Sequence, residues 1–73
     1  MRYTVVLRPD EDGRLCVEVP VLPGCFTYGD TYEEAITNAR EAIVCYLASL
    51  RKDGEEIPTE HGPAVTTTVE VTV

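Results

Sequence analysis

The sequence predicts a small α+β domain of order β-β-β-α-β, in which one antiparallel-rich sheet is covered on one face by one long helix. Apolar residues alternate with polar ones near both ends of the chain, as they do in strands with one buried face. Between these ends, residues 31–53 carry apolar side chains at helical spacing. At 73 residues the chain has room for one domain only, so residues 1–73 are expected to fold as a single unit.

The first two strands are predicted from the alternation within residues 2–19. A turn cluster, Pro9-Asp-Glu-Asp-Gly13, divides this stretch and supplies a glycine for a positive φ angle. Two alternating runs joined by such a turn indicate a β-hairpin. Its expected buried face consists of Tyr3, Val5, Leu7, Leu15, Val17 and Val19.

A short third strand and a long helix are predicted next. Pro20 and Pro23 interrupt the pairing pattern, residues 25–28 form the third strand, and Asp30 or Thr31 caps the helix, which ends before Gly54. Val44 and Ala48 are expected to widen the buried face of the helix, with contact to a partner as the alternative. The expected buried stripe is Tyr32, Ala35, Ile36, Ala39, Ile43, Tyr46, Leu47 and Leu50.

The most regular alternation lies at residues 65–73, where β-branched residues dominate. We expect this segment to be a strand that returns to the same sheet and buries Val69 and Val71. A terminal strand and so small a core also favour self-association. We therefore expect a homodimer or homotetramer, with these residues as the first candidate contact: Val65, Thr67, Val69, Val71 and Val73.

Composition narrows the class of partner. Thirteen acidic residues against six basic ones give a net charge of −7, which argues against direct contact with nucleic acid and favours basic proteins. No stretch has the length of a membrane span or a signal peptide, so a cytoplasmic location is expected.

The three cysteines, at positions 16, 25 and 45, are expected to be small buried or half-buried residues and not disulfides.

No catalytic, cofactor-binding or metal-binding arrangement is recognisable. His61 is the only histidine and is expected to be a solvated loop residue. The turn acids Asp10, Glu11 and Asp12 could hold Mg²⁺, but adjacent acids are also ordinary turn residues. The sequence therefore favours a binding protein over an enzyme.

The stretch Leu22-Pro-Gly-Cys-Phe-Thr-Tyr-Gly-Asp-Thr-Tyr-Glu-Glu-Ala, continued by Asn38-Ala-Arg-Glu-Ala-Ile43, resembles the HicB antitoxin family. The opening Tyr-Thr-Val-Val and the later Asp53-Gly-Glu-Glu-Ile-Pro58 also match, so the resemblance covers nearly the whole chain. It implies a partial ribonuclease-H-like fold and a small, basic, RNA-cleaving HicA-type toxin as partner. The DNA-binding extension that many HicB proteins carry has no counterpart within these residues, so operator binding does not transfer.

From this resemblance we expect an acidic rim to contact the toxin and cover its RNA-binding surface. Two alternatives stay open: a stand-alone oligomeric regulator or scaffold with no toxin partner, and a metal-dependent nuclease that uses the hairpin acids. The expected rim consists of Asp10, Glu11, Asp12, Glu33, Glu34 and Glu41.

Overall fold

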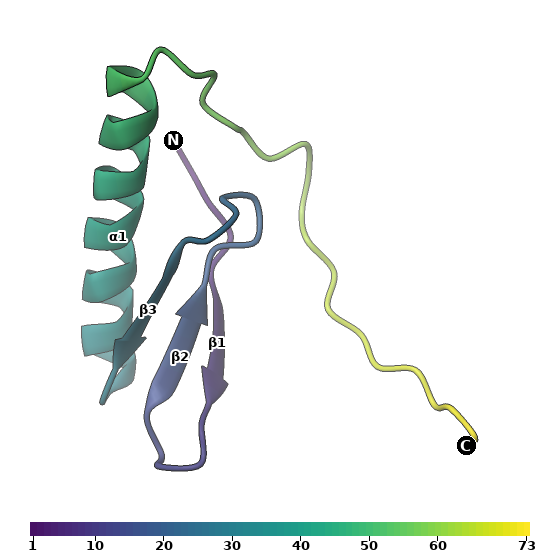
Figure 1. The fold of residues 1–73 in the computed structure, drawn as a ribbon. Helices are drawn as coiled ribbons and strands as arrows, with labels where there is room; N and C mark the ends of the chain where they lie inside the picture. The colour runs from purple at the N-terminus through teal and green to yellow at the C-terminus, as the bar shows by residue number, and fades with distance from the viewer.

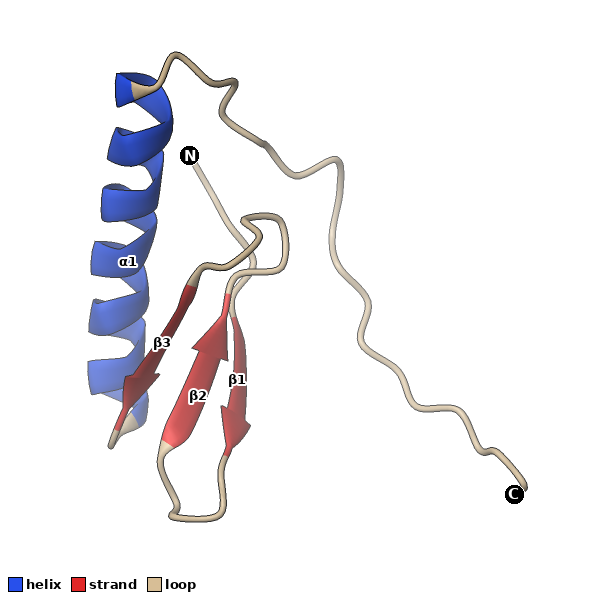
Figure 2. Cartoon of the chain, viewed as in Figure 1, coloured by secondary structure: helices blue, strands red, loops and turns tan.

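A computed structural model describes residues 1–73 as three short strands followed by one long helix (Figure 1). The strands are β1 (Val6–Pro9), β2 (Leu15–Glu18) and β3 (Phe26–Gly29), and the helix is α1 (Tyr32–Lys52). The sheet is antiparallel with the order β1-β2-β3, and α1 lies along one side of it (Figure 2). The predicted α+β class, with three strands leading into one helix, is confirmed.

The hairpin between β1 and β2 is held by its own turn. One carboxylate oxygen of Asp10 accepts hydrogen bonds from the backbone N–H groups of Asp12 and Arg14, each at 2.9 Å. Gly13 between them has a φ of +83°, a conformation that costs glycine little. The predicted hairpin is confirmed, although β1 begins at Val6 and not at residue 2. In this register residue 4 would face Pro20, which has no backbone N–H to pair.

The core lies between the sheet and α1 and forms two small clusters. Val17 packs with Ala35 and Ala39 of the helix, as the alternation within β2 predicts. Val19 packs with Leu22 and Cys25, which belong to the connection between β2 and β3. Only seven residues are buried, so much of the apolar surface of α1 is only partly covered.

The ends of α1 follow the predicted capping pattern. The Thr31 hydroxyl accepts a hydrogen bond from the Glu34 N–H at 3.1 Å, and the Glu34 carboxylate accepts one from the Asp30 N–H at 3.2 Å. These reciprocal bonds satisfy amides that have no partner within the helix. Gly54 follows the helix with a φ of +70°.

No helix here combines the length and the apolarity that crossing a membrane requires.

Three of the predicted core positions on α1 are wrong. Tyr32, Val44 and Ala48 are exposed. The helix contacts the sheet chiefly along β3 and β2, so its buried stripe is narrow and begins at Ala35. Val44 and Ala48 lie to the side of that stripe and do not widen it.

The predicted fourth strand is also corrected. Residues 65–73 form no strand and pair with no part of the sheet. Val69 and Val71, which we expected to be buried, are 81% and 74% exposed. The loop after α1 is bonded to residues 3 and 4 through Pro58 and Glu60, and the chain beyond it extends away from the body (Figure 1). The alternation indicates a segment able to form a strand, but periodicity within a segment cannot specify its neighbour.

The sheet and the helix approach each other closely at Gly29. A Cβ atom on Gly29 would lie 2.3 Å from the backbone nitrogen of Ala35 and 2.5 Å from its Cα. These atoms belong to the helix backbone and cannot rotate away. Gly29, the last residue of β3, is thus required for the close packing of the helix.

We predict that Gly29→Ala lowers the free energy of unfolding by about 1–3 kcal/mol, because the helix must move outward to admit the methyl group. Chemical denaturation followed by circular dichroism measures this. Ala48→Ser, on the exposed side of α1, is the control and should change stability by less than about 0.5 kcal/mol. Equal stability of the Gly29 variant and the wild type would contradict the packing described here.

Candidate partner-binding surfaces

The structure brings five of the six predicted rim acids to one end of the molecule. The hairpin turn with Asp10, Glu11 and Asp12 and the first turn of α1 with Glu33 and Glu34 lie at the same end (Figure 1). Glu41 lies farther along the helix, about 12 Å from Glu33 at about 1.5 Å per residue. The sixth acid thus extends the rim up the helix.

These acids differ in what they do. Asp10 and Glu34 accept backbone hydrogen bonds in the turn and in the helix cap, so they stabilise local structure. The other four rim acids are exposed and take part in neither of the two ion pairs, which join Arg8 to Glu18 and Arg14 to Asp30. The four acids available to a partner are Glu11, Asp12, Glu33 and Glu41.

A second surface, which the sequence interpretation missed, is the face of the sheet turned away from α1. Phe26 is 62% exposed and Tyr28 is 52% exposed. The register aligns Phe26 with Glu18 and Val6, and Tyr28 with Cys16 and Arg8. We define these six residues as the outer sheet face. Aromatic side chains left in water on one face are typical of protein-binding surfaces.

Two arginines, one on the outer sheet face and one beside it, contact side chains of that face. The Arg8 guanidinium donates to Glu18 at 3.0 Å, and that of Arg14 lies 4.8 Å from the centre of the Tyr28 ring. The sequence contained a signal for the aromatic pair. Small residues at positions 27 and 29 suit the side where the helix approaches, which leaves the large residues at 26 and 28 facing outward.

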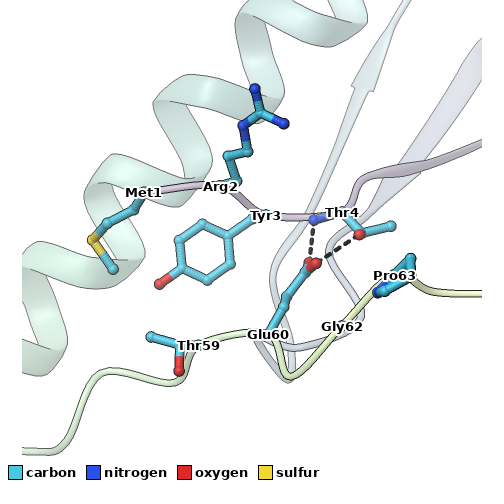
Figure 3. A pocket seen from close by; sticks show the side chains of 8 residues that line it. All are labelled: Met1, Arg2, Tyr3, Thr4, Thr59, Glu60, Gly62 and Pro63. Atoms are coloured by element: carbon cyan, nitrogen blue, oxygen red, sulfur yellow. Dashed lines mark hydrogen bonds between the residues drawn. The ribbon is translucent and has the colours of Figure 1, made fainter.

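A third feature is the crossing of the N-terminal segment and the loop after α1 (Figure 3). The Tyr3 hydroxyl donates to the Pro58 carbonyl at 2.7 Å, and the Thr4 hydroxyl donates to the Glu60 carboxylate at 2.8 Å. The Thr4 backbone N–H donates to the same carboxylate. A hollow of about 650 Å³, with both polar and apolar walls, lies beside these bonds. Their evident role is to fasten the loop to the segment that enters β1.

A fourth feature is an apolar groove between the N-terminal segment and α1. Its volume is about 610 Å³. Because α1 packs on β3 and β2, its side chains toward the N-terminal segment are incompletely covered. We call this feature the helix groove, and its apolar walls include Val5, Ile36, Ile43, Val44 and Leu47.

The cysteines are all free and occupy different environments. Cys25 is buried, and desolvation raises the pKa of its thiol. Cys16 is half-buried, with its sulfur 3.9 Å from the Asp10 carboxylate. Cys45 is exposed on α1, so the expectation of a buried or half-buried residue is wrong for it.

Comparison with known proteins identifies the family. The model of a protein family described as "HicB-like antitoxin of bacterial toxin–antitoxin system" matches residues 3–70. The chain belongs to the HicB-like antitoxin family. The resemblance seen in the sequence motifs is therefore confirmed. Antitoxins of this family act with a toxin partner and are generally not enzymes.

Similar proteins come from archaea and bacteria. A UPF0150 protein of Thermoplasma acidophilum is 50% identical over 66 residues, which is 90% of this HicB-like chain and 96% of that protein. Antitoxin HicB 1 of Photorhabdus laumondii is 41% identical over 58 residues, which is 80% of this chain but 37% of that antitoxin. The chain thus corresponds to little more than a third of the longer antitoxin.

A solved structure supports the same fold. The N-terminal domain of the Burkholderia pseudomallei antitoxin HicB superposes with a TM-score of 0.70 at 32% identity, over 81% of this chain and 69% of that one. The arrangement of three antiparallel strands and one long helix is therefore shared with a HicB N-terminal domain.

We predict that iodoacetamide at about pH 8 modifies Cys45 first and Cys25 last. A thiol with a raised pKa holds less of the reactive thiolate at this pH, and burial also blocks access. Mass spectrometry of digested samples gives each rate. Denaturant should remove the difference between the two sites. Modification of native Cys25 as fast as Cys45 would refute the burial.

Proposed function

We propose that this HicB-like domain neutralises a small, basic, RNA-cleaving toxin of the HicA type by covering the surface with which the toxin binds RNA. The family supplies the class of partner. The observation that supports the mechanism most is the group of exposed acids, free of ion pairs, at one end of the domain and along the adjoining part of α1, in a chain with a net charge of −7.

Charge gives the first step of the mechanism. A toxin that binds RNA presents cationic surface to phosphate groups. Glu11 and Asp12 on the hairpin turn, with Glu33 and Glu41 on the helix, can approach that surface without first breaking an internal ion pair. Long-range attraction steers the encounter and is weakened by salt. The bound acids then occupy the positions that RNA phosphates require.

Apolar contact supplies the lasting affinity in this proposal. Phe26 and Tyr28 on the outer sheet face are the only aromatic residues of the three strands, and both are exposed. Tyr28 lies toward the hairpin end of β3, since its neighbour Gly29 pairs with Leu15 at the start of β2. One partner could therefore touch both the acids and the aromatic pair. Burial of aromatic side chains commonly controls dissociation.

We predict that reversing rim charges slows association with the cognate toxin. Glu11→Lys with Asp12→Lys, and separately Glu33→Lys with Glu41→Lys, should lower the association rate constant at least about tenfold at low salt. Surface plasmon resonance over a salt series measures this. The control reverses two exposed acids beyond the other end of α1, Glu55→Lys with Glu56→Lys, and should have a smaller effect.

Phe26→Ser separates the apolar contact from the charges in the same assay. It should increase the dissociation rate by roughly 30-fold, equivalent to about 2 kcal/mol, and leave the association rate nearly unchanged. If rim and Phe26 variants all bind with wild-type rates, the proposed surfaces are wrong although the antitoxin role stands. If no toxin from the same genome binds the wild-type chain, the antitoxin role fails and the stand-alone regulator replaces it.

A further inference from the structure

We propose that residues 65–73 form a strand on the free edge of β1 in a second copy of this chain, so that two copies exchange their C-terminal segments. We call these residues the tail. This inference concerns self-assembly and does not depend on the toxin-binding role. It rests on three features of one molecule: an unpaired tail with strand chemistry, an unpaired sheet edge, and an apolar groove beside that edge.

The tail has the composition of a strand and none of its hydrogen bonds. Valines at 65, 69, 71 and 73 alternate with threonines and one glutamate, and all four are at least 74% exposed. No backbone group after Glu55 takes part in a backbone–backbone hydrogen bond. A β-branched segment of this kind gains most when it joins a sheet.

The β1 edge is the matching half of the contact. In the order β1-β2-β3, β1 pairs with β2 only, so its other edge presents unpaired backbone groups. Such an edge is a template for another strand. Nine tail residues span about 30 Å when extended, which is more than the four residues of β1 require.

Side-chain chemistry agrees with placement at this edge. In a strand beside β1, the valine side of the tail can face α1, as Leu7 does, and cover the helix groove with its exposed Val44. The opposite side carries Glu70, and the neighbouring outer sheet face carries Arg8. The valine side of the tail thus matches the apolar helix groove, and its polar side would lie beside the Arg8–Glu18 ion pair.

The path of the loop after α1 favours pairing of the tail with the β1 edge of a second copy over pairing with the β1 edge of its own chain. Glu60 is bonded to Thr4 beside the entrance to β1, and yet the chain after Pro63 leaves the body instead of following β1 (Figure 1). Proline fixes its own φ and restricts the residue before it. A restricted connection that directs the tail outward favours exchange between copies, and reciprocal exchange about a two-fold axis closes the assembly at two chains.

Sedimentation equilibrium of the 73-residue chain tests the assembly. The wild type should be a dimer, or a multiple of dimers, at high micromolar concentration. Val69→Asp with Val71→Asp should raise the dimer dissociation constant at least about 100-fold, because the charges would be buried without partners. Thr68→Asp with Thr72→Asp, the same charges on the other side of the tail, is the matched control and should stay within a few-fold of the wild type.

An isotope-filtered NMR experiment on mixed labelled and unlabelled wild-type chains tests the exchange itself and needs no variant. Contacts should appear between tail valine methyl groups of one copy and Val5, Leu7 or Val44 of the other. The proposal is overturned by a wild-type monomer, by a dimer that keeps its affinity in the Val69/Val71 variant, or by tail contacts confined to the same chain.

Discussion

The close contact between Gly29 and Ala35 determines where α1 lies on the sheet, and the core and the exposed surfaces depend on that position. Because position 29 has no Cβ, the helix backbone approaches the end of β3 to a distance that any other residue would prevent. This contact places α1 over β3 and β2, where Val17 packs against Ala35 and Ala39. It also leaves β1 with less helix contact than β3 and β2, although Leu7 still packs against the Ala35 and Ala39 cluster, so the opposite edge of the sheet is incompletely covered.

The binding surfaces follow from this off-centre helix. Inward positions of β3 hold small residues because the helix is near, and the large Phe26 and Tyr28 face outward into water. On the other side, the apolar flank of α1 and the N-terminal segment border the helix groove. A domain with so few buried residues does not complete its own core. Covering the outer sheet face and the helix groove with other chains would therefore bury further apolar surface.

The acidic rim illustrates how one set of like charges divides into different roles. Asp10 and Glu34 are bonded to backbone N–H groups at a turn and at a helix start, where anions stabilise local structure. Glu11, Asp12, Glu33 and Glu41 have no such bonds and remain in solvent. Fold stability and partner binding are therefore served by different members of the same cluster, and a substitution can affect one without the other.

The sequence by itself determined the hairpin, the helix with both of its caps, and the family, because each is encoded by residues close together in the chain. Asp10 with Gly13 makes its turn locally, and Thr31 with Glu34 makes its cap locally. Two results needed the tertiary structure. The outward turn of Phe26 and Tyr28 depends on where the helix packs, and the unpaired tail depends on which edge, if any, it meets. The alternation of apolar and polar residues indicates that residues 65–73 have two unlike faces. It does not identify the strand they pair with, because backbone hydrogen bonds are the same for every sequence and the partner depends on the assembled sheet.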